Sequence, residues 1–378
     1  MSRQRAALVL TTVNNPTLLK GYFANFDRYG HLDQIDVIVI PDEKTPPAAY
    51  DLCSELGRGG MKISCPTLAE QDAYLAGIGL APAALPRNSD NRRNVGYLMA
   101  YASGVDFLIS IDDDNYCLPD EDFFAQHAAV CCDEVPVELV DSATGFFNIC
   151  NLLVSDAAGK AYPRGFPFHK RHLDEAVRSS TASVPIHINA GLWTLDPDID
   201  AISWLVLKPH VTGFHGRSVA LGPNAWTPIN TQNTALRRAA IPAYYFIRMG
   251  YPISGLAIDR YGDILSGYFA QACARRLGGY IRVGTPIAEH KRNSHNYMKD
   301  AAGEWGCILT LEDLLPWLTA HRLEGNSYVE TFESLSHAME DAVETMRGSV
   351  WTDATRGYFH QTAYYMRLWA RACRVIGG

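Results

Sequence analysis

The amino-acid sequence predicts an α/β protein with a mostly parallel central sheet, helices on both of its faces and a helical appendage at the C-terminus. Two short runs rich in β-branched residues, 6–13 and 35–40, are typical of buried strands. The segment between them, 18–29, is amphipathic and long enough for a helix that connects one strand to the next. Strand, helix and strand in this order favour a parallel sheet.

A further helix and strand follow the same pattern. Residues 90–103 are predicted to be helical, Gly104 ends the helix, and residues 105–111 form another apolar strand. Ligands of open α/β sheets bind at the carboxyl ends of the strands. We therefore expect the chemistry of this chain at the residues that follow Ile111.

Composition excludes several classes of protein. The chain has 378 residues, of which 47% are hydrophobic and 20% charged, so it has the apolar surface for a sizeable core. Its net charge of −8, without any run dense in Lys and Arg, makes a nucleic-acid partner unexpected. Nine cysteines without a C-x-x-C pair favour reduced thiols. Since no apolar stretch is long enough to span a bilayer, we expect a cytoplasmic protein.

The rest of the chain divides into a loop-rich middle and a helical end. Residues 134–235 are rich in Gly, Pro, Asn and Thr, which predicts strands and long loops. Helical patterns return later in the chain, at 239–249, 264–277, 328–347 and 358–376. We expect a catalytic unit over residues 1–310 and a helical extension over residues 311–378, whose amphipathic faces leave room for a homo-oligomer.

Three consecutive carboxylates, Asp112, Asp113 and Asp114, directly follow the apolar strand. Adjacent carboxylates repel one another unless a cation offsets their charge. Oxygen ligands of this kind suit Mg²⁺ or Mn²⁺, and such a metal would in turn hold a diphosphate. A solvated acidic turn is the alternative. We predict a metal site at Asp112 and Asp114.

Two basic segments are candidates for anion binding. Arg92 and Arg93 open the helix before the acidic loop, where guanidinium and backbone N–H groups together can hold a phosphate. Residues 288–296 contain His290, which could complete a metal site, and also Lys291 and Arg292, which could neutralise a leaving diphosphate. A solvated helix face and a basic surface loop are the respective alternatives.

Asp263 is a candidate general base. It lies beside a glycine at the start of a predicted helix, where a carboxylate could activate an acceptor hydroxyl or hold a sugar. Capping of the helix N-terminus would equally account for this residue.

Several motifs in chain order resemble those of GT-A-type glycosyltransferases, and more narrowly of the reversibly glycosylated polypeptide family, which includes UDP-arabinopyranose mutases. The strand and triplet ISIDDD resemble the family's DDD loop, and YPRGFPF is similar to its RGYPF segment. The stretches AGLW, DIDA and LKP are similar to its GLW, DYDA and VKP. The sequence RYGD resembles its RYDD, and HKRN its HSKASN loop. The resemblance as a whole covers residues 6–310 and is patchy between the motifs. The similar segments are, in order, 109–114, 162–168, 190–193, 198–201, 207–209, 260–263 and 290–293.

The resemblance implies a GT-A-like, Rossmann-related fold that binds a nucleoside-diphosphate sugar with Mn²⁺ or Mg²⁺. It places Asp113, Asn189, Trp193 and Lys291 among the nucleotide-sugar-binding residues. It also implies that Arg164 is the residue that becomes glycosylated. From residue chemistry alone a guanidinium is a poor nucleophile because it stays protonated, so an arginine that binds phosphate or carboxylate is preferred.

The chain departs from the family pattern at three places. RYDD has become RYGD, which removes one carboxylate; the segment 228–233 lacks the family's CGMN cysteine; and the tail beyond residue 311 has no counterpart. These differences favour a metal-dependent glycosyltransferase that moves a sugar, expected to come from UDP, to an unknown acceptor. The alternatives are a pyranose–furanose mutase with self-glycosylation at Arg164 and a non-catalytic, self-glycosylated scaffold.

Overall fold

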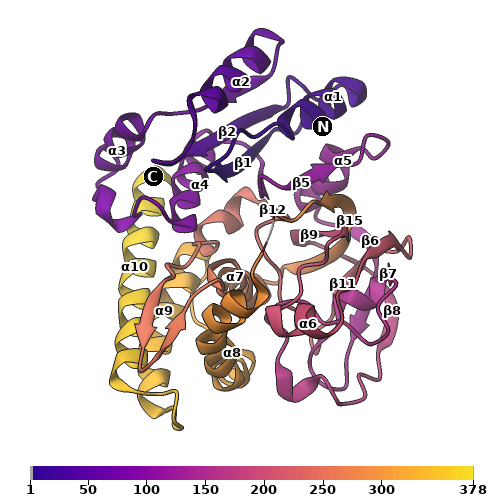
Figure 1. Cartoon of the computed structure of the whole chain (residues 1–378), viewed down its shortest axis with the longest axis vertical. Coiled ribbons are helices and arrows are strands. Elements are labelled where there is room, and N and C mark those ends of the chain that lie inside the picture. The colour runs from indigo at the N-terminus through magenta and orange to yellow at the C-terminus, as the bar shows by residue number, and fades with distance from the viewer. Residues whose placement is uncertain (1–2, 294, 378) are drawn as a thin grey trace.

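The computed structural model describes residues 3–293 and 295–377 and is built around one thirteen-stranded sheet, with the core strand order β3-β2-β1-β4-β12-β9-β15-β11-β6-β8 (Figure 1). The first four strands in this order are parallel to one another. Their bounds are β1 Ala6–Thr12, β2 Ile35–Pro41, β3 Lys62–Ser64 and β4 Phe107–Ile111. The predicted α/β fold is therefore confirmed.

Beyond β4 the sheet is mixed. β12 (Asn233–Arg237) runs antiparallel to both β4 and β9 (Ile186–Leu195), whereas β9 is parallel to β15 (Tyr280–His290). The other strands of this sheet are β5 Asn115–Cys117, β6 Val135–Asp141, β7 Leu153–Ser155, β8 Arg178–Val184, β10 Val211–Phe214 and β11 Val219–Leu221. A separate hairpin pairs β13 (Tyr251–Ile253) with β14 (Leu256–Ile258).

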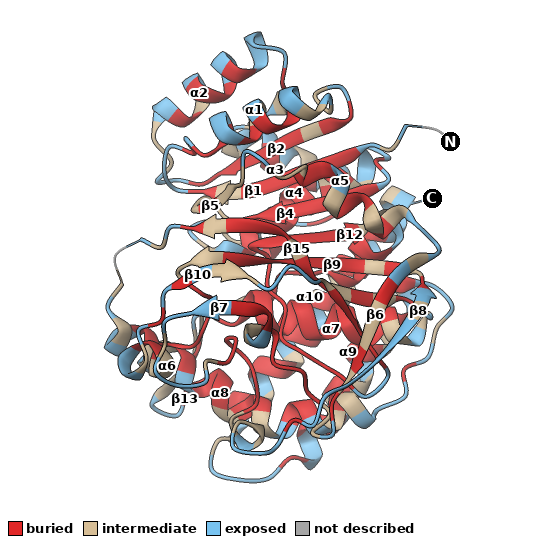
Figure 2. Cartoon of the chain, turned by 90° about the vertical axis from the view of Figure 1, so that its right-hand side faces the viewer, coloured by how far each residue is buried: buried red, intermediate tan, exposed pale blue. Residues whose placement is uncertain are grey.

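Helices cover both faces of the sheet because its strands alternate their side chains between two apolar clusters (Figure 2). In β1, Leu8 belongs to the cluster that includes residues of α1, α2 and α5, whereas Val9 belongs to the cluster that includes residues of α4 and α7–α10. The helices are α1 Leu19–Tyr29, α2 Pro47–Arg58, α3 Leu68–Gly77, α4 Arg93–Ala102, α5 Phe123–His127, α6 Ala201–Val206, α7 Gly262–Arg276, α8 Tyr297–Ala320, α9 Tyr328–Thr345 and α10 Asp353–Gly377. None of these helices is long and apolar enough to cross a membrane.

One predicted helix is wrong. Within residues 239–249 the only helical structure is a 3-10 turn, Arg238–Ala243, and the chain after it has no regular secondary structure. Pro242 lacks the N–H group that a continuing helix needs, and the apolar residues after it are buried in the core without helical hydrogen bonds. Because these apolar residues are buried at successive positions, their spacing alone does not distinguish a buried helix from a buried segment without regular structure.

The boundary expected at residue 310 falls inside α8, which runs unbroken from Tyr297 to Ala320. Residues of α8, α9 and α10 belong to the same apolar cluster as β1 and β9. The C-terminal helices thus complete the core on one face of the sheet, and the structure does not divide the chain at that point.

Candidate functional site

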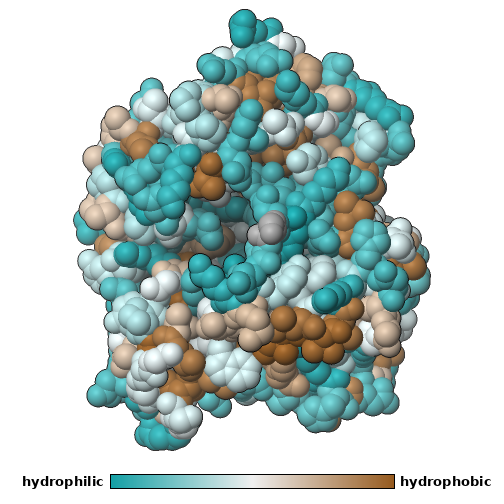
Figure 3. All heavy atoms as spheres, in the orientation of Figure 1, coloured by the Kyte–Doolittle hydropathy of each residue, from teal (hydrophilic) through white to brown (hydrophobic). Residues whose placement is uncertain are grey.

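A cavity of about 650 Å³ opens at the carboxyl ends of β1, β2 and β4, where the sequence predicts ligand binding. On the face seen in Figure 3, the surface is hollowed near its middle and mostly hydrophilic residues surround the hollow. Of the predicted site residues, the lining includes Arg92, Arg93, Asp112, Asp113, Asp114, Arg164, Asp263 and His290. Segments far apart in the sequence thus converge on one pocket.

The acidic loop is held by the strands on either side of β4. The side chain of Asp113 accepts a hydrogen bond of 2.6 Å from Thr12 Oγ1, at the end of β1, and one of 3.3 Å from Asn14. The backbone N–H of Asp112 donates to the Gln232 carbonyl, just before β12. Since β1 and β12 flank β4, the sheet itself fixes the carboxylates at the cavity wall.

His290 reaches the acidic loop because the end of β15 pairs with β5, which places His290 opposite Asn115. Its Nε2 lies 3.4 Å from Asp114 Oδ2, and its Nδ1 lies 2.6 Å from the Asp196 carbonyl. A carbonyl can only accept, so Nδ1 carries a proton, and a hydrogen bond from Nε2 to Asp114 requires the ring to be doubly protonated and charged. A metal ion held by Asp114 and Nε2 would take the place of that second proton. A backbone carbonyl that orients one ring nitrogen in this way is common behind metal-bound histidines.

The electrostatics of the acidic loop differ from residue to residue. Burial raises the pKa of Asp112 to about 6, and the nearby Asp114 and Asp263 add to this effect, although Arg93 opposes it. Burial also acts to raise the pKa of Asp114, but the hydrogen bond and charge of His290 outweigh it, so that pKa lies below its ordinary value. The same pairing raises the pKa of His290 against the effect of burial. A cation in the cavity would relieve the accumulated negative charge.

The two adjacent arginines have different surroundings. Arg93 is buried and ion-paired with Asp112 at 2.5 Å, and it also donates to Ser110 Oγ and the Thr231 carbonyl. The guanidinium of Arg92 instead donates to Gln71, the Leu85 carbonyl and Asp72, none of which lines the cavity. Arg93 therefore orders the acidic loop, and Arg92 anchors the start of α4 to its neighbours rather than offering its charge to a ligand.

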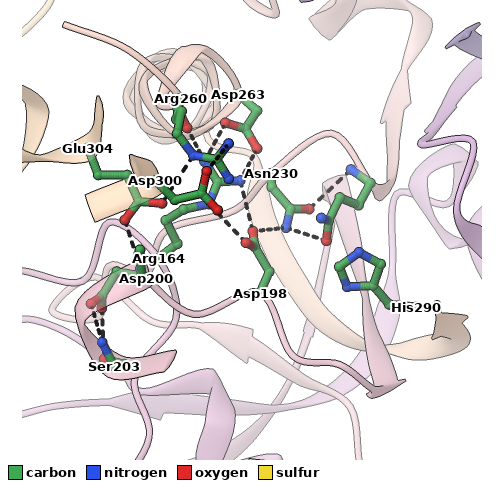
Figure 4. Close-up of polar contacts among 12 residues, drawn as sticks. Arg164, Asp198, Asp200, Ser203, Asn230, Arg260, Asp263, His290, Asp300 and Glu304 are labelled. Atoms are coloured by element: carbon green, nitrogen blue, oxygen red, sulfur yellow. Dashed lines mark hydrogen bonds and ion pairs between the residues drawn. The ribbon is translucent and has the colours of Figure 1, made fainter. Parts of the chain in front are cut away.

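Arg164 lies between two carboxylates (Figure 4). Its Nε and Nη2 donate to Asp198 at 2.9 and 3.0 Å, and its Nη1 and Nη2 donate to Asp263 at 3.0 and 2.6 Å. Nη1 also donates to the carbonyl of Arg260. All five N–H groups of the guanidinium therefore have protein acceptors. Burial alone would lower the pKa of Arg164, but the two carboxylates raise it well above its ordinary value.

Steric crowding explains why the RYGD motif has a glycine at position 262. A Cβ at Gly262 would lie 2.5 Å from the Ile247 carbonyl and 2.5 Å from the Phe246 ring. The chain therefore has no room for a side chain at the first residue of α7, and Asp263 is the carboxylate of this motif that faces the cavity.

Three predicted binding residues lie outside the cavity lining. Asn189 is buried behind it and hydrogen-bonds to His127 and the Thr285 carbonyl. Trp193 is also buried, and its indole N–H donates to Gln232 at 2.9 Å. Lys291 is turned outward to Glu289 at 2.9 Å. Asn189 and Trp193 lie in β9, and Lys291 directly follows β15.

Sequence reasoning missed several lining residues. Asp198 is buried against Arg164, and burial raises the pKa of Asp90, which opens the turn before α4. Of the two basic residues predicted after His290, Arg292 reaches the lining and Lys291 does not. The loops after β1 and β2 contribute Asn14 and Asp42. Asn14 and Asp42 could have been predicted, because they follow β1 and β2, which run parallel to β4 and therefore end at the same edge of the sheet as the acidic loop.

The donors fit a metal that draws few ligands from the protein. Among the residues that the structure describes, no three His, Cys, Asp or Glu side chains are arranged as a closed metal site. Mg²⁺ and similar ions, however, are usually bound by one or two carboxylates together with substrate phosphates and water. Asp114 and His290, 3.4 Å apart, suit two positions of such an ion, whereas Asp112 is drawn towards Arg93.

Comparison with known proteins adds a family. The family model described as "Reversibly glycosylated polypeptide" matches residues 78–377, which includes the C-terminal helices. The expectation that the tail beyond residue 311 has no counterpart is therefore wrong. The tail contributes many core residues, but its amphipathic helices contain no short motif by which the resemblance could be seen in the sequence.

Curated relatives carry two kinds of name. A probable UDP-arabinopyranose mutase 1 from Pisum sativum is 27% identical over 285 residues, 74% of this chain and 70% of the relative. A probable glycosyltransferase, STELLO1, from Arabidopsis thaliana is 24% identical over 273 residues, 68% of this chain. The chain spans only 34% of the length of STELLO1.

The chain is also similar to solved structures. Glucosyl-3-phosphoglycerate synthase from Mycobacterium tuberculosis, in complex with Mn²⁺ and UDP-glucose, is 12% identical with a TM-score of 0.41. The aligned region covers 82% of this chain and 79% of the synthase.

Proposed function

Because the chain belongs to the reversibly glycosylated polypeptide family, we propose that it is a metal-dependent glycosyltransferase that moves a sugar from a nucleoside diphosphate, UDP in the first instance, to an acceptor. The observation that carries the proposal is the convergence of the acidic loop, His290 and Asp263 on one cavity at the carboxyl edge of the sheet. A cavity of about 650 Å³ is within the size range of small-ligand sites.

Each residue has a role that its contacts support. Asp114 and His290 would hold Mn²⁺ or Mg²⁺, which supplies positive charge where the leaving diphosphate develops negative charge. Arg93 keeps Asp112 in place through their ion pair, and Thr12 does the same for Asp113. Asp263 keeps lone pairs free beyond its bonds to Arg164 and is positioned to accept a hydrogen bond from a sugar or acceptor hydroxyl.

Titration of UDP by calorimetry, with and without Mn²⁺, tests the metal site. We expect Mn²⁺ to strengthen UDP binding at least about tenfold in the unmodified protein and to have no such effect in Asp114→Asn or His290→Ala. Asp120→Asn is the matched control, because the Asp120 side chain is 83% exposed, does not line the cavity and is only six residues from Asp114. Equal UDP affinity with and without Mn²⁺ in the unmodified protein would contradict the proposal.

A mutase that interconverts pyranose and furanose forms is the second candidate, favoured by the 27% identity to a probable UDP-arabinopyranose mutase. Glycosylation of Arg164 would require its guanidinium to lose a proton and to leave acceptors that occupy all of its N–H groups. Incubation of the protein with UDP-arabinopyranose separates the candidates. Ring-isomerised product without any acceptor supports the mutase, whereas UDP release that an acceptor accelerates supports the transferase.

A further inference from the structure

A second cavity, of about 460 Å³, lies at the opposite end of the elements that carry the candidate active site. The first cavity contains residues from the start of α7 and the segment before α8, and His290 from the end of β15. The second is formed by the end of α7, the end of α8 and the start of β15. Since α7 has fifteen residues, the two sites are separated by about 22 Å along this helix.

The charge of the second cavity is of one sign. Its lining contains Arg275, Arg276, Arg322 and His321, and no aspartate or glutamate. Throughout residues 3–293 and 295–377, no carboxylate oxygen lies within 4 Å of any of these three guanidinium groups. In a chain with a net charge of −8, three arginines without acidic partners in one pocket are conspicuous. Such a pocket attracts anions.

Arg275 forms the inner wall of this pocket. It donates to the carbonyls of Gly222 and Pro223 at 3.0 and 3.3 Å, and its guanidinium carbon lies 4.5 Å from the centre of the Trp226 ring. Its Nε is buried and has no hydrogen-bond partner among the described residues. Burial lowers the pKa of Arg275 to about 10, and the charge of Asp141 offsets this only in part. The positive charge is therefore incompletely balanced by the protein.

Arg276 and Arg322 lie at the open side. The Nε of Arg276 donates to the Leu323 carbonyl at 2.8 Å, which fixes the side chain at the rim. Within the described part of the chain, its two terminal nitrogens have no acceptor, and neither has the guanidinium of Arg322. A guanidinium with two free N–H groups pointing the same way matches the geometry of a phosphate.

We propose that this cavity binds a small phosphate ester, of the size of a sugar phosphate or mononucleotide. Arg276 and Arg322 contact the phosphate, and the apolar surfaces of Leu221, Trp226 and Leu318 contact the organic part. A volume of about 460 Å³ suits a ligand of this size. The site does not depend on the proposed transferase reaction, because it shares no lining residue with the first cavity.

Calorimetry with ribose 5-phosphate, in buffer containing a chelator, tests the proposal. We expect saturable binding with a dissociation constant below about 1 mM, and binding of unphosphorylated ribose weaker by at least tenfold. The double variant Arg276→Ala/Arg322→Ala should lose at least tenfold in affinity for ribose 5-phosphate. Arg58→Ala is the matched control, because Arg58 is also exposed at a helix end and its Nε also donates to a backbone carbonyl.

Two results would overturn the proposal: no saturation by about 10 mM ribose 5-phosphate, or unchanged affinity in the double variant. Crystals soaked in tungstate provide a second measurement that needs no variant, and an anomalous peak beside Arg276 and Arg322 is expected. A soak that leaves this cavity without a peak contradicts the proposal. Titration of UDP with Mn²⁺ in the same variants reports on the first cavity alone, so failure at one site is distinguishable from failure at the other.

Discussion

At the scale of single residues, the contacts of Arg164 determine the charge balance of the candidate site. Two buried carboxylates, on Asp198 and Asp263, share one guanidinium, and Asn230 donates a further hydrogen bond of 2.7 Å to Asp198. Removing one partner of a buried ion pair costs more than the pair contributes, because the remaining charge is left unpaired in a poorly solvated position. Arg164 is thus both a structural residue and one that sets the position of Asp263.

Replacement of Arg164 tests this interpretation. We expect Arg164→Ala to lower the free energy of unfolding by about 3–5 kcal/mol, because Asp198 and Asp263 are then left without a cation. Arg164→Lys keeps the charge but cannot reproduce the paired hydrogen bonds, so its cost should be smaller. Denaturant titration followed by circular dichroism measures both. Arg217→Ala breaks an exposed pair with Glu138 and should cost less than about 1 kcal/mol; an equal cost for Arg217→Ala and Arg164→Ala would refute the argument.

At the scale of elements, α7 is buried nearly all round and packs directly against the chain that leads into β12. A Cβ at Gly267 would lie 2.1 Å from the carbonyl oxygen of Ile229. That carbonyl belongs to the segment that carries Thr231 and Gln232 into the cavity lining. The close approach of helix and backbone therefore supports the site from behind.

Two glycine substitutions in helices should have opposite signs. Gly267→Ala should destabilise the protein by about 1–3 kcal/mol, because the added methyl group meets a backbone atom that cannot move aside. Gly357→Ala, in α10, should stabilise it by up to about 1 kcal/mol, because a Cβ there meets nothing within 4 Å and alanine favours a helix. Thermal unfolding of both variants provides the measurement. Stabilisation by Gly267→Ala would show that α7 is less tightly packed than the structure indicates.

The buried His127, at the end of α5 beside the sheet, predicts that the free energy of unfolding depends on pH. His127 is buried, its Nε2 lies 2.9 Å from Asn233 Oδ1, and its Nδ1 lies 3.0 Å from Asn189 Nδ2. Burial lowers the pKa of His127 to about 3, against about 6.5 in an unfolded chain. The unfolded state then binds the proton first, so the contribution of His127 to stability is complete above pH 6.5 and is lost as the pH falls towards 3.

Between pH 7 and pH 5 this loss amounts to about 2 kcal/mol. The variant His127→Gln should therefore show a difference in unfolding free energy between these two pH values that is smaller by about that amount. The control His337→Gln removes an exposed histidine and should leave the pH dependence as it is. Parallel pH profiles for His127→Gln and the unmodified protein would mean that His127 is solvated enough to titrate normally.

Sequence-based prediction was correct for elements that a single pattern identifies. β1, β2 and β4 were found from short β-branched or apolar runs, and the acidic loop after β4 was placed at the cavity because parallel strands end at the same edge. The helix predicted at 239–249 failed because periodicity cannot distinguish a buried helix from a buried segment without regular structure. Arg92 and Arg93 could not be told apart either, since one residue of helix rotation decides which guanidinium faces the acidic loop.

At the scale of the whole molecule, the C-terminal helices share one apolar cluster with the strands that lead to the candidate site. The indole N–H of Trp369, in α10, donates to the Pro242 carbonyl at 2.8 Å, and its ring packs against Tyr245. The chain that follows, Phe246 and Ile247, lines the cavity. A continuous path of packed side chains thus connects the tail to the site, which argues against a separable appendage.

Trp369→Ala should therefore destabilise the entire protein and not the tail alone. We expect a cost of about 3–5 kcal/mol, because the substitution leaves a large cavity in the core and removes the hydrogen bond to Pro242. Unfolding followed by far-UV circular dichroism and by the fluorescence of the six remaining tryptophans, which include Trp193 in β9 and Trp305 and Trp317 in α8, should give coincident transitions. Tyr364→Ala, on the same helix but 53% exposed, should change stability by less than about 0.5 kcal/mol. If the two transitions instead have different midpoints, the tail folds as an independent unit and the boundary near residue 310 is real.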